Sequence, residues 1–155
     1  MVGLGGVGGL VAATLSRGGF DVAAVVRSPE RRRALRAHGL QASGLSGGDR
    51  RVHLGGLYGS LEEASQGGPY DAVLLATQND ALGAVVPRLA PLLAADTPWI
   101  CLQNGLAEER VAAMLAEAGV SGQVHGAVLS FGAEVRRPTQ VAQTARGGVT
   151  LGCLE

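Results

Sequence analysis

The sequence predicts an α/β fold in which a parallel sheet carries helices on both faces. Three observations lead to this prediction. Short runs of β-branched residues alternate with longer stretches rich in alanine and leucine, as parallel strands and their crossover helices require. The runs at 71–76 and 99–102 are almost uninterruptedly apolar, which is typical of strands covered on both sides. A glycine-rich turn at residues 3–8 directly precedes the first helical stretch.

The composition is that of one globular domain, expected to span residues 1–155, because 46% of the residues are hydrophobic and only 17% are charged. The 25 glycines follow no three-residue period and therefore indicate tight turns rather than a fibre. The 13 basic and 13 acidic side chains cancel, so no overall field attracts nucleic acid or an anionic membrane. Since the chain lacks a membrane-spanning run and a signal-peptide pattern, we expect a cytoplasmic protein.

The first half of the chain predicts strands and helices in alternation. Ser28 is the expected N-cap of one helix, because Pro29 suits the first helical position, and Gly39 is its expected stop. The predicted elements are a very short strand at 1–2, a helix at 7–17, a strand at 20–26, a helix at 29–37, an edge strand at 51–54 within the glycine-rich stretch 40–59, and a short helix at 61–65.

The second half repeats the alternation and is expected to end in a β-hairpin. Pro87 lies inside one predicted helix and Gly119 ends another, while Arg146-Gly147-Gly148 is the expected hairpin turn. The predicted elements are a strand at 71–76, a helix at 81–93, a strand at 99–102, a helix at 108–118, a strand at 124–131, and a terminal hairpin that pairs 139–144 with 149–153.

The segment Gly3-Leu4-Gly5-Gly6-Val7-Gly8 satisfies the pattern G-x-G-x-x-G, which makes the predicted fold a Rossmann-type one. The first glycine permits a tight turn, the second lets the backbone approach a pyrophosphate, and the third lets the helix pack on the sheet. The N-terminus of that helix offers free amides to the phosphates. In a chain so rich in glycine, a plain glycine turn is the alternative interpretation.

Arg27 occupies the place, at the end of the second strand, where domains that prefer NAD carry an acid. Asp21 lies at the wrong end of that strand. Arg27, followed by Ser28 and by Arg31 and Arg32, can meet a 2′-phosphate with a planar guanidinium, so NADP is favoured over NAD. For the run 31–33 the alternative is a solvated helix face, since consecutive helical residues point in different directions.

Together with the glycine turn, Arg27 and the strand 71–76, two further segments carry a family resemblance. They are Leu102-Gln103-Asn104-Gly105 and the closing run Gly147-Gly148-Val149-Thr150-Leu151-Gly152. Over its whole length the chain resembles the N-terminal domain of ketopantoate reductases. The resemblance implies reduction of a small 2-keto acid, typically 2-dehydropantoate on the route to pantothenate, by hydride from NADPH.

The resemblance places Asn104 beside the nicotinamide and the substrate, where an amide can donate and accept hydrogen bonds. A common Asn-Gly turn is the alternative interpretation. Gln78 stands where the family usually carries a lysine that contacts the phosphate end of the cofactor. Asn104 is thus the residue expected to be catalytic, and the expected cofactor-binding residues are Gly3, Leu4, Gly5, Gly6, Val7, Gly8, Arg27, Gln78 and Asn104.

The chain contains no lysine, whereas the family's principal acid is a lysine of a helical C-terminal domain that this sequence lacks. The first strand is also short, so we expect truncation at both ends and a chain that is inactive alone. A stand-alone NAD(P)-binding module without turnover and a related two-domain dehydrogenase with another substrate stay open as alternatives. The sequence also leaves room for a homodimer.

No metal site and no nucleophilic catalysis are expected. Cys101 and Cys153 show no C-x-x-C spacing, and the three histidines lie far apart in the sequence. Ser130 and Cys101 have no evident base partner, so a buried cysteine is the preferred interpretation of Cys101.

Overall fold

The computed structural model describes residues 1–44 and 49–153, and its centre is a sheet in the order β4-β1-Val2-β5-β6-β7-β10. Val2 forms parallel bridges to Val25 and to Leu75 and so joins β1 to β5. All pairings in this sheet are parallel except that of β10 with β7. Its strands are β1 (Ala23–Val25), β4 (Gly56–Tyr58), β5 (Val73–Leu75), β6 (Trp99–Cys101), β7 (Val124–Leu129) and β10 (Val149–Cys153).

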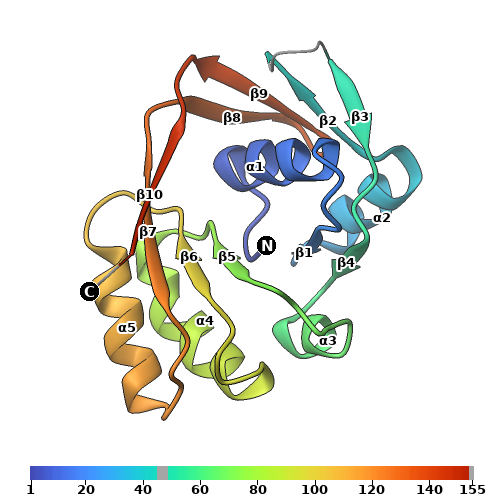
Figure 1. Cartoon of the computed structure of the whole chain (residues 1–155). Helices are drawn as coiled ribbons and strands as arrows, with labels where there is room; N and C mark the ends of the chain where they lie inside the picture. Colours follow the sequence, from blue (N-terminus) through green and yellow to red (C-terminus); the bar gives the residue numbers. More distant parts are fainter. Residues whose placement is uncertain (45–48, 154–155) are drawn as a thin grey trace.

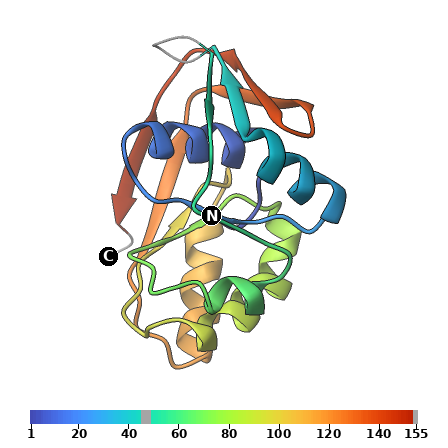
Figure 2. The same cartoon turned by 90° about the vertical axis from the view of Figure 1, so that its right-hand side faces the viewer.

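Helices cover both faces of this sheet, as predicted (Figures 1 and 2). One core cluster, with the fully buried Leu75, Trp99 and Val111, lies beneath α4 and α5. A second cluster, which includes Leu10 and Leu35, lies beneath α1 and α2. The helices are α1 (Gly6–Arg17), α2 (Pro29–His38), α3 (Leu61–Ser65), α4 (Leu82–Leu89) and α5 (Ala107–Glu117), with short 3₁₀ turns η1 (Asn79–Ala81) and η2 (Ala90–Leu92).

A second, smaller sheet covers the outer side of α1 (Figure 1). Its order is β3-β2-β9-β8, and β2 pairs in parallel with β9. A Cβ placed on Gly9 would lie 2.7 Å from Cγ1 of Val141 in β9, so the helix packs closely under this sheet. Its strands are β2 (Leu40–Ser43), β3 (Arg50–Val52), β8 (Gly132–Arg137) and β9 (Gln140–Ala145).

The predicted terminal hairpin between 139–144 and 149–153 is wrong. β9 pairs with β8 in the second sheet, whereas β10 pairs with β7 in the central sheet. The reason lies at Ser130, whose backbone N–H donates to Gly148 O at 3.1 Å and whose Oγ accepts from Gly148 N at 2.9 Å. These bonds continue the ladder of β7, so the segment Arg146-Gly147-Gly148 connects two sheets instead of turning back on β9.

Other predicted bounds of helices and strands differ from the structure where the local sequence signals are weak. The stretch 40–59 contains three strands, β2, β3 and β4, in place of the single edge strand predicted, and its residues 45–48 lie outside the described part. The predicted helix 81–93 ends at Leu89, because Pro91 has no N–H to continue the helical ladder. The predicted start after Ser28 is confirmed, since Ser28 Oγ accepts from Arg31 N at 3.2 Å.

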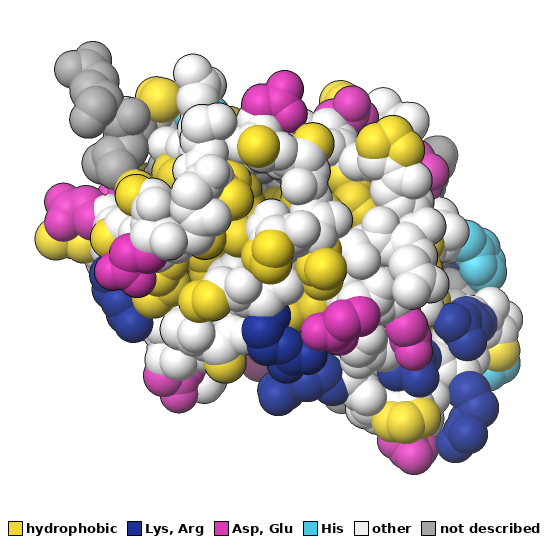
Figure 3. All heavy atoms as spheres, turned by 90° about the horizontal axis from the view of Figure 1, so that it is seen from below, with side chains coloured by type: hydrophobic (Ala, Val, Ile, Leu, Met, Phe, Trp, Pro, Cys, Tyr) yellow, Lys and Arg dark blue, Asp and Glu magenta, His cyan; other side chains and the backbone are white. Residues whose placement is uncertain are grey.

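Charged side chains of both signs lie scattered on the face shown in Figure 3, and neither sign forms a continuous surface there. Among the described residues, no helix is both long enough and apolar enough to span a bilayer.

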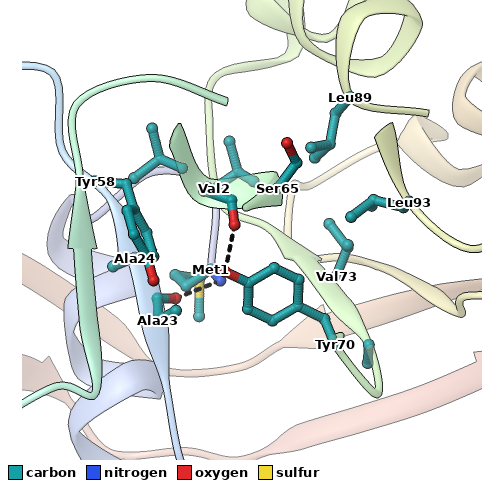
Figure 4. Close-up of a pocket in the computed structure, with 13 residues that line it drawn as sticks. Met1, Val2, Ala23, Ala24, Tyr58, Ser65, Tyr70, Val73, Leu89 and Leu93 are labelled. Carbon is teal, nitrogen blue, oxygen red and sulfur yellow. Dashed lines mark hydrogen bonds between the residues drawn. The ribbon is translucent and has the colours of Figure 1, made fainter. Parts of the chain in front are cut away.

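The amino group of Met1 lies inside the protein, next to a small pocket of about 30 Å³ (Figure 4). It donates a hydrogen bond to Ala23 O at 2.8 Å, and Val25 N donates to Met1 O at 3.0 Å. Tyr58 and Tyr70 line the same pocket. Burial lowers the pKa of this amino group from 8.0 to about 6.

We expect this amino group to make the stability depend on pH. In a chain whose first residue is Met1, the folded state binds the proton more weakly than the unfolded state does. The free energy of unfolding should therefore be highest above pH 8 and fall by about 2 to 3 kcal/mol as the pH drops through 6. Urea unfolding at pH 8.5 and pH 5.5 measures this difference. Residues added ahead of Met1 should reduce it, and an equal difference in both chains would contradict the assignment.

Candidate functional site

The glycine turn begins at Gly3, whose φ of +93° lies in the left-handed region. A Cβ at this position would lie 2.8 Å from Ala76 O and 3.0 Å from Thr77 N, at the end of β5. Both the backbone conformation and the contact with β5 therefore require glycine. The turn is thereby held against the carboxyl end of the neighbouring strand.

Two other glycines of the turn are also tightly packed. A Cβ on Gly8 would overlap Gly3 O and lie 2.9 Å from Ala76 Cβ, and a Cβ on Gly6 would lie 2.5 Å from Ala133 O in β8. Leu4 points into the core beneath α1, with 4% of its surface exposed, and Val7 is half-buried. Within this segment, Gly6 and Gly8 thus fix the start of α1 between the two sheets.

Gly5 is different, since a Cβ placed on it meets no atom within 4 Å. Gly5 is the N-cap of α1, and Gly9 N donates the first helical bond to Gly5 O at 2.9 Å. The amides before Gly9 have no acceptor within the helix. The first turn of α1 holds no acidic residue. The arrangement offers amide donors, the positive end of a helix dipole and open space beside Gly5, which suits an anion.

Arg27 lies two residues after the end of β1 and is exposed. The neighbouring arginines contact other parts of the protein: Arg32 Nη1 donates to Val26 O at 3.0 Å, and Arg36 Nη2 donates to Leu57 O at 2.7 Å. Arg33 lies 3.9 Å from Glu30. Among the hydrogen bonds and ion pairs of the described residues, none involves the guanidinium of Arg27, so it is available to a ligand.

Arg31 does not lie on a solvated face. Its Nε donates to Pro138 O at 2.9 Å, and its half-buried position lowers the pKa of the guanidinium. The side chain thus joins α2 to the turn between β8 and β9. Of the run 31–33, only Arg33 is an exposed helix residue, with 74% of its side chain accessible.

Polar side chains follow β5 and β6 at the same edge of the sheet. Gln78 is exposed and is the N-cap of η1, while Thr77 is half-buried beside the glycine turn. Gln103 Nε2 lies 3.5 Å from Thr77 Oγ1, and Gln103 Oε1 is buried with no hydrogen-bond partner among the described residues. Thr77 and Gln103 were not predicted as site residues from the sequence. Their position directly after two neighbouring parallel strands was the signal that could have found them.

Asn104 is exposed, and its backbone is held by the following helix and by η1. Asn79 Nδ2 donates to Asn104 O at 3.0 Å, and Arg110 Nη1 donates to Asn79 O at 3.3 Å. Gly105, with a φ of +90°, makes the turn after it. The Asn-Gly turn is therefore present, and the exposed side-chain amide of Asn104 is at the same time available to a ligand.

The predicted site residues thus come together at one edge of the central sheet. The glycine turn contacts the end of β5, and the end of β5 contacts Gln103 at the end of β6. Arg27 lies at the same edge, since β1 runs parallel to the strands beside it. No group of His, Cys, Asp or Glu side chains that could hold a metal ion occurs within residues 1–44 and 49–153.

Comparisons with known proteins agree with this architecture. The family model for ketopantoate reductase PanE/ApbA matches residues 1–155. No curated protein matches the chain by sequence.

Solved structures of similar fold are about twice as long as this chain. A 2-dehydropantoate 2-reductase from Geobacter metallireducens GS-15 is 30% identical, with a TM-score of 0.80, over 98% of this chain and 48% of that one. A PanE/ApbA family ketopantoate reductase from Ralstonia eutropha JMP134 is 25% identical, with a TM-score of 0.80, over 97% and 49%. A D-mandelate dehydrogenase in a ternary structure with NADH is 22% identical, with a TM-score of 0.74, over 97% and 47%. Because the family model matches the whole chain, the chain belongs to the ketopantoate reductase family PanE/ApbA.

Proposed function

We propose that residues 1–155 form the dinucleotide-binding domain of a reductase that uses NADPH to reduce a 2-keto acid, namely 2-dehydropantoate to pantoate. One observation carries this proposal. The glycine turn is closed by packing at Gly3, Gly6 and Gly8 and open at Gly5, at the N-terminus of α1. Membership of the ketopantoate reductase family supports the substrate.

The residues present fit a dinucleotide phosphate. At Gly5 the open space and the first amides of α1 would receive the pyrophosphate, with no carboxylate in the first turn to repel it. The exposed guanidinium of Arg27 would hold a 2′-phosphate through charge-assisted hydrogen bonds. An acid that would accept bonds from a ribose 2′-hydroxyl is not found at this position, which favours NADP over NAD.

The nicotinamide half of the cofactor would lie toward the ends of β5 and β6. Asn104 presents an exposed amide there, on a turn held by Asn79 and Arg110. We propose that this amide orients the nicotinamide and the substrate carbonyl, and that Gln78 contacts the cofactor from the end of β5. The unpartnered Oε1 of Gln103 is a further acceptor at this place. When bound, NADPH supplies the hydride, and these residues position the reacting groups.

Reduction of the keto group also requires a proton for the developing alkoxide. This chain contains no lysine that could donate it. The solved relatives are about twice as long as this chain. The resemblance to ketopantoate reductases implies that a lysine of a helical C-terminal domain has that role. We therefore expect the chain alone to bind NADPH without oxidising it when 2-dehydropantoate is added. A longer protein carrying this chain and such a domain should show 2-dehydropantoate-dependent loss of absorbance at 340 nm, and activity toward other 2-keto acids only would contradict the proposed substrate.

A Gly5→Ala variant should distinguish an effect on NADPH binding from an effect on the stability of the fold. The added Cβ meets no protein atom, so the free energy of unfolding should fall by at most about 1 kcal/mol, through the preference at the N-cap. The same Cβ occupies the space proposed for the pyrophosphate, so the affinity for NADPH should fall at least about tenfold. Fluorescence titration and urea unfolding measure the two effects. Unchanged NADPH affinity would contradict the assignment of the phosphate position.

A dehydrogenase that acts on another substrate is the second candidate, because a D-mandelate dehydrogenase shares the fold. The location in the cytoplasm stays a prediction, which cell fractionation would test.

A further inference from the structure

An open groove of about 650 Å³ lies between the N-terminus of α2 and the turn that joins β8 to β9. Ser28 and Arg31 line it from α2, and Arg137 and Pro138 line it from the second sheet. The two walls therefore come from segments about a hundred residues apart in the sequence. Because Ser28 directly follows Arg27, the groove begins beside the residue proposed to hold the 2′-phosphate.

Arg31 holds the two walls of the groove together. Its backbone N–H donates to Ser28 Oγ at 3.2 Å, and its Nε donates to Pro138 O at 2.9 Å. The first bond caps α2, and the second fixes the turn between β8 and β9 against this helix. The Nη2 atom of Arg31 is buried and has no hydrogen-bond partner among the described residues. None of their carboxylates forms an ion pair with this guanidinium, so the wall of the groove carries an unbalanced positive charge.

The two arginines at the end of β8 differ in whether a carboxylate neutralises them. Arg136 Nε lies 2.5 Å from Glu134 Oε1, so these two charges balance each other. The register of β8 against β9 shifts between Val135 and Arg137, and a bulge of this kind redirects the side chains beside it. Arg137 is exposed, and its guanidinium takes part in none of the side-chain hydrogen bonds and ion pairs of the described residues. Arg137 is therefore available to a ligand.

The groove has an excess of positive charge. Glu30 is the acidic side chain that lines it, and Glu30 Oε1 lies 3.9 Å from Arg33 Nη2. Arg31 and Arg137 line the same groove without an ion-pair partner among the described residues, and Arg27 beside it adds a third positive charge. Charges at short range attract strongly where water is partly excluded. The groove therefore suits a ligand group with about two negative charges, such as a phosphate monoester.

We infer that Arg137 is a second contact for the 2′-phosphate of NADP and acts together with Arg27. The inference rests on the proposed function and adds a residue of the second sheet that determines the preference for NADPH. Two guanidinium groups can donate several charge-assisted hydrogen bonds to the oxygens of one phosphate. The open groove leaves room for this phosphate beside Arg137. NADH carries a hydroxyl at the same position of the ribose, so Arg137 should strengthen the binding of NADPH alone.

Titration of Arg137 variants with NADPH and, separately, with NADH tests this inference, with the ratio of the two affinities as the readout. Arg137→Ala should weaken NADPH binding about 5- to 20-fold and leave NADH binding unchanged. Arg137→Lys keeps the charge but lacks the planar fork, so it should recover part of this loss. Arg136→Ala is the matched control, because the charge of Arg136 is balanced by Glu134, and it should change either affinity by less than about twofold.

The results distinguish a failure of this inference from a failure of the proposed function. A preference for NADPH that Arg27→Ala reduces and Arg137→Ala leaves unchanged would overturn the role of Arg137 and keep the proposed function. Equal weakening of NADPH and NADH by Arg137→Ala would also overturn this role, because the arginine would then act on the fold or on the whole cofactor. Binding of neither nucleotide by the unmodified chain would overturn both. Urea unfolding of the Arg137 variants should match that of the unmodified chain, since Arg137 is exposed.

Discussion

A Gly8→Val chain is expected to unfold with a free energy at least about 3 kcal/mol lower than that of the unmodified chain. The Cβ of the valine would by itself overlap the backbone oxygen of Gly3 and lie 2.9 Å from Ala76 Cβ. Neither neighbour can move easily, because Gly3 is itself held against the end of β5. The start of α1, the glycine turn and β5 would have to separate. Urea unfolding followed by circular dichroism measures the loss.

Gly83 in α4 provides the matched control for this prediction. It is also a helical glycine, but it is exposed and a Cβ placed on it meets nothing within 4 Å. Gly83→Ala should therefore stabilise the chain by a few tenths of a kcal/mol to about 1 kcal/mol, as helix propensity predicts. A Gly8→Val chain as stable as the Gly83→Ala chain would show that the packing at Gly8 is not what fixes the turn.

An Arg27→Ala chain is expected to bind NADPH about 10- to 100-fold more weakly while its affinity for NADH stays the same. The guanidinium of Arg27 is exposed just after β1 and makes no ion pair with the described residues, so its removal costs the fold little. Its proposed partner, the 2′-phosphate, is present only in NADPH. The ratio of the two affinities is therefore the quantity to measure.

Arg33→Ala is the control for a general loss of positive charge, because Arg33 is an exposed arginine of the same region whose ion-pair partner is Glu30. It should leave the preference for NADPH unchanged. Equal weakening of NADPH and NADH by Arg27→Ala would mean that Arg27 acts on the fold or on the whole cofactor rather than on the 2′-phosphate.

The central sheet could be predicted because its signals are local. The strands β5 and β6 are buried on one face and half-buried on the other and are therefore apolar in sequence, and Ser28 with Pro29 marks the start of α2. The second sheet could not be predicted in the same way. Its strand β8 is largely polar and exposed, and the parallel partner of β2 is β9, about a hundred residues later. Such pairing is decided by packing over α1 and not by the residues of one segment.

The same distinction applies to the candidate site. The motif predicted where the turn would be tight and where it would be open, since these properties follow from the backbone of residues 3–8. It could not predict that Gly6 packs on Ala133, because that contact requires the second sheet. The support of Asn104 by Asn79 and Arg110 was also not predictable, since three separate segments meet there.

Arg31 shows how a charged residue can mislead a prediction from sequence. Its place in the run 31–33 suggested a solvated helix face as the alternative, yet the residue is half-buried and its Nε bonds to Pro138 O. The aliphatic part of a long side chain can be buried while its polar end finds a distant carbonyl.

The central claim, that the glycine turn and Arg27 bind the phosphates of NADP, is tested most directly by titrating the purified chain with NADPH and, separately, with NADH while following nicotinamide fluorescence. The claim predicts saturable binding of both, with NADPH at least about tenfold tighter. Binding of neither nucleotide, or tighter binding of NADH, would contradict it.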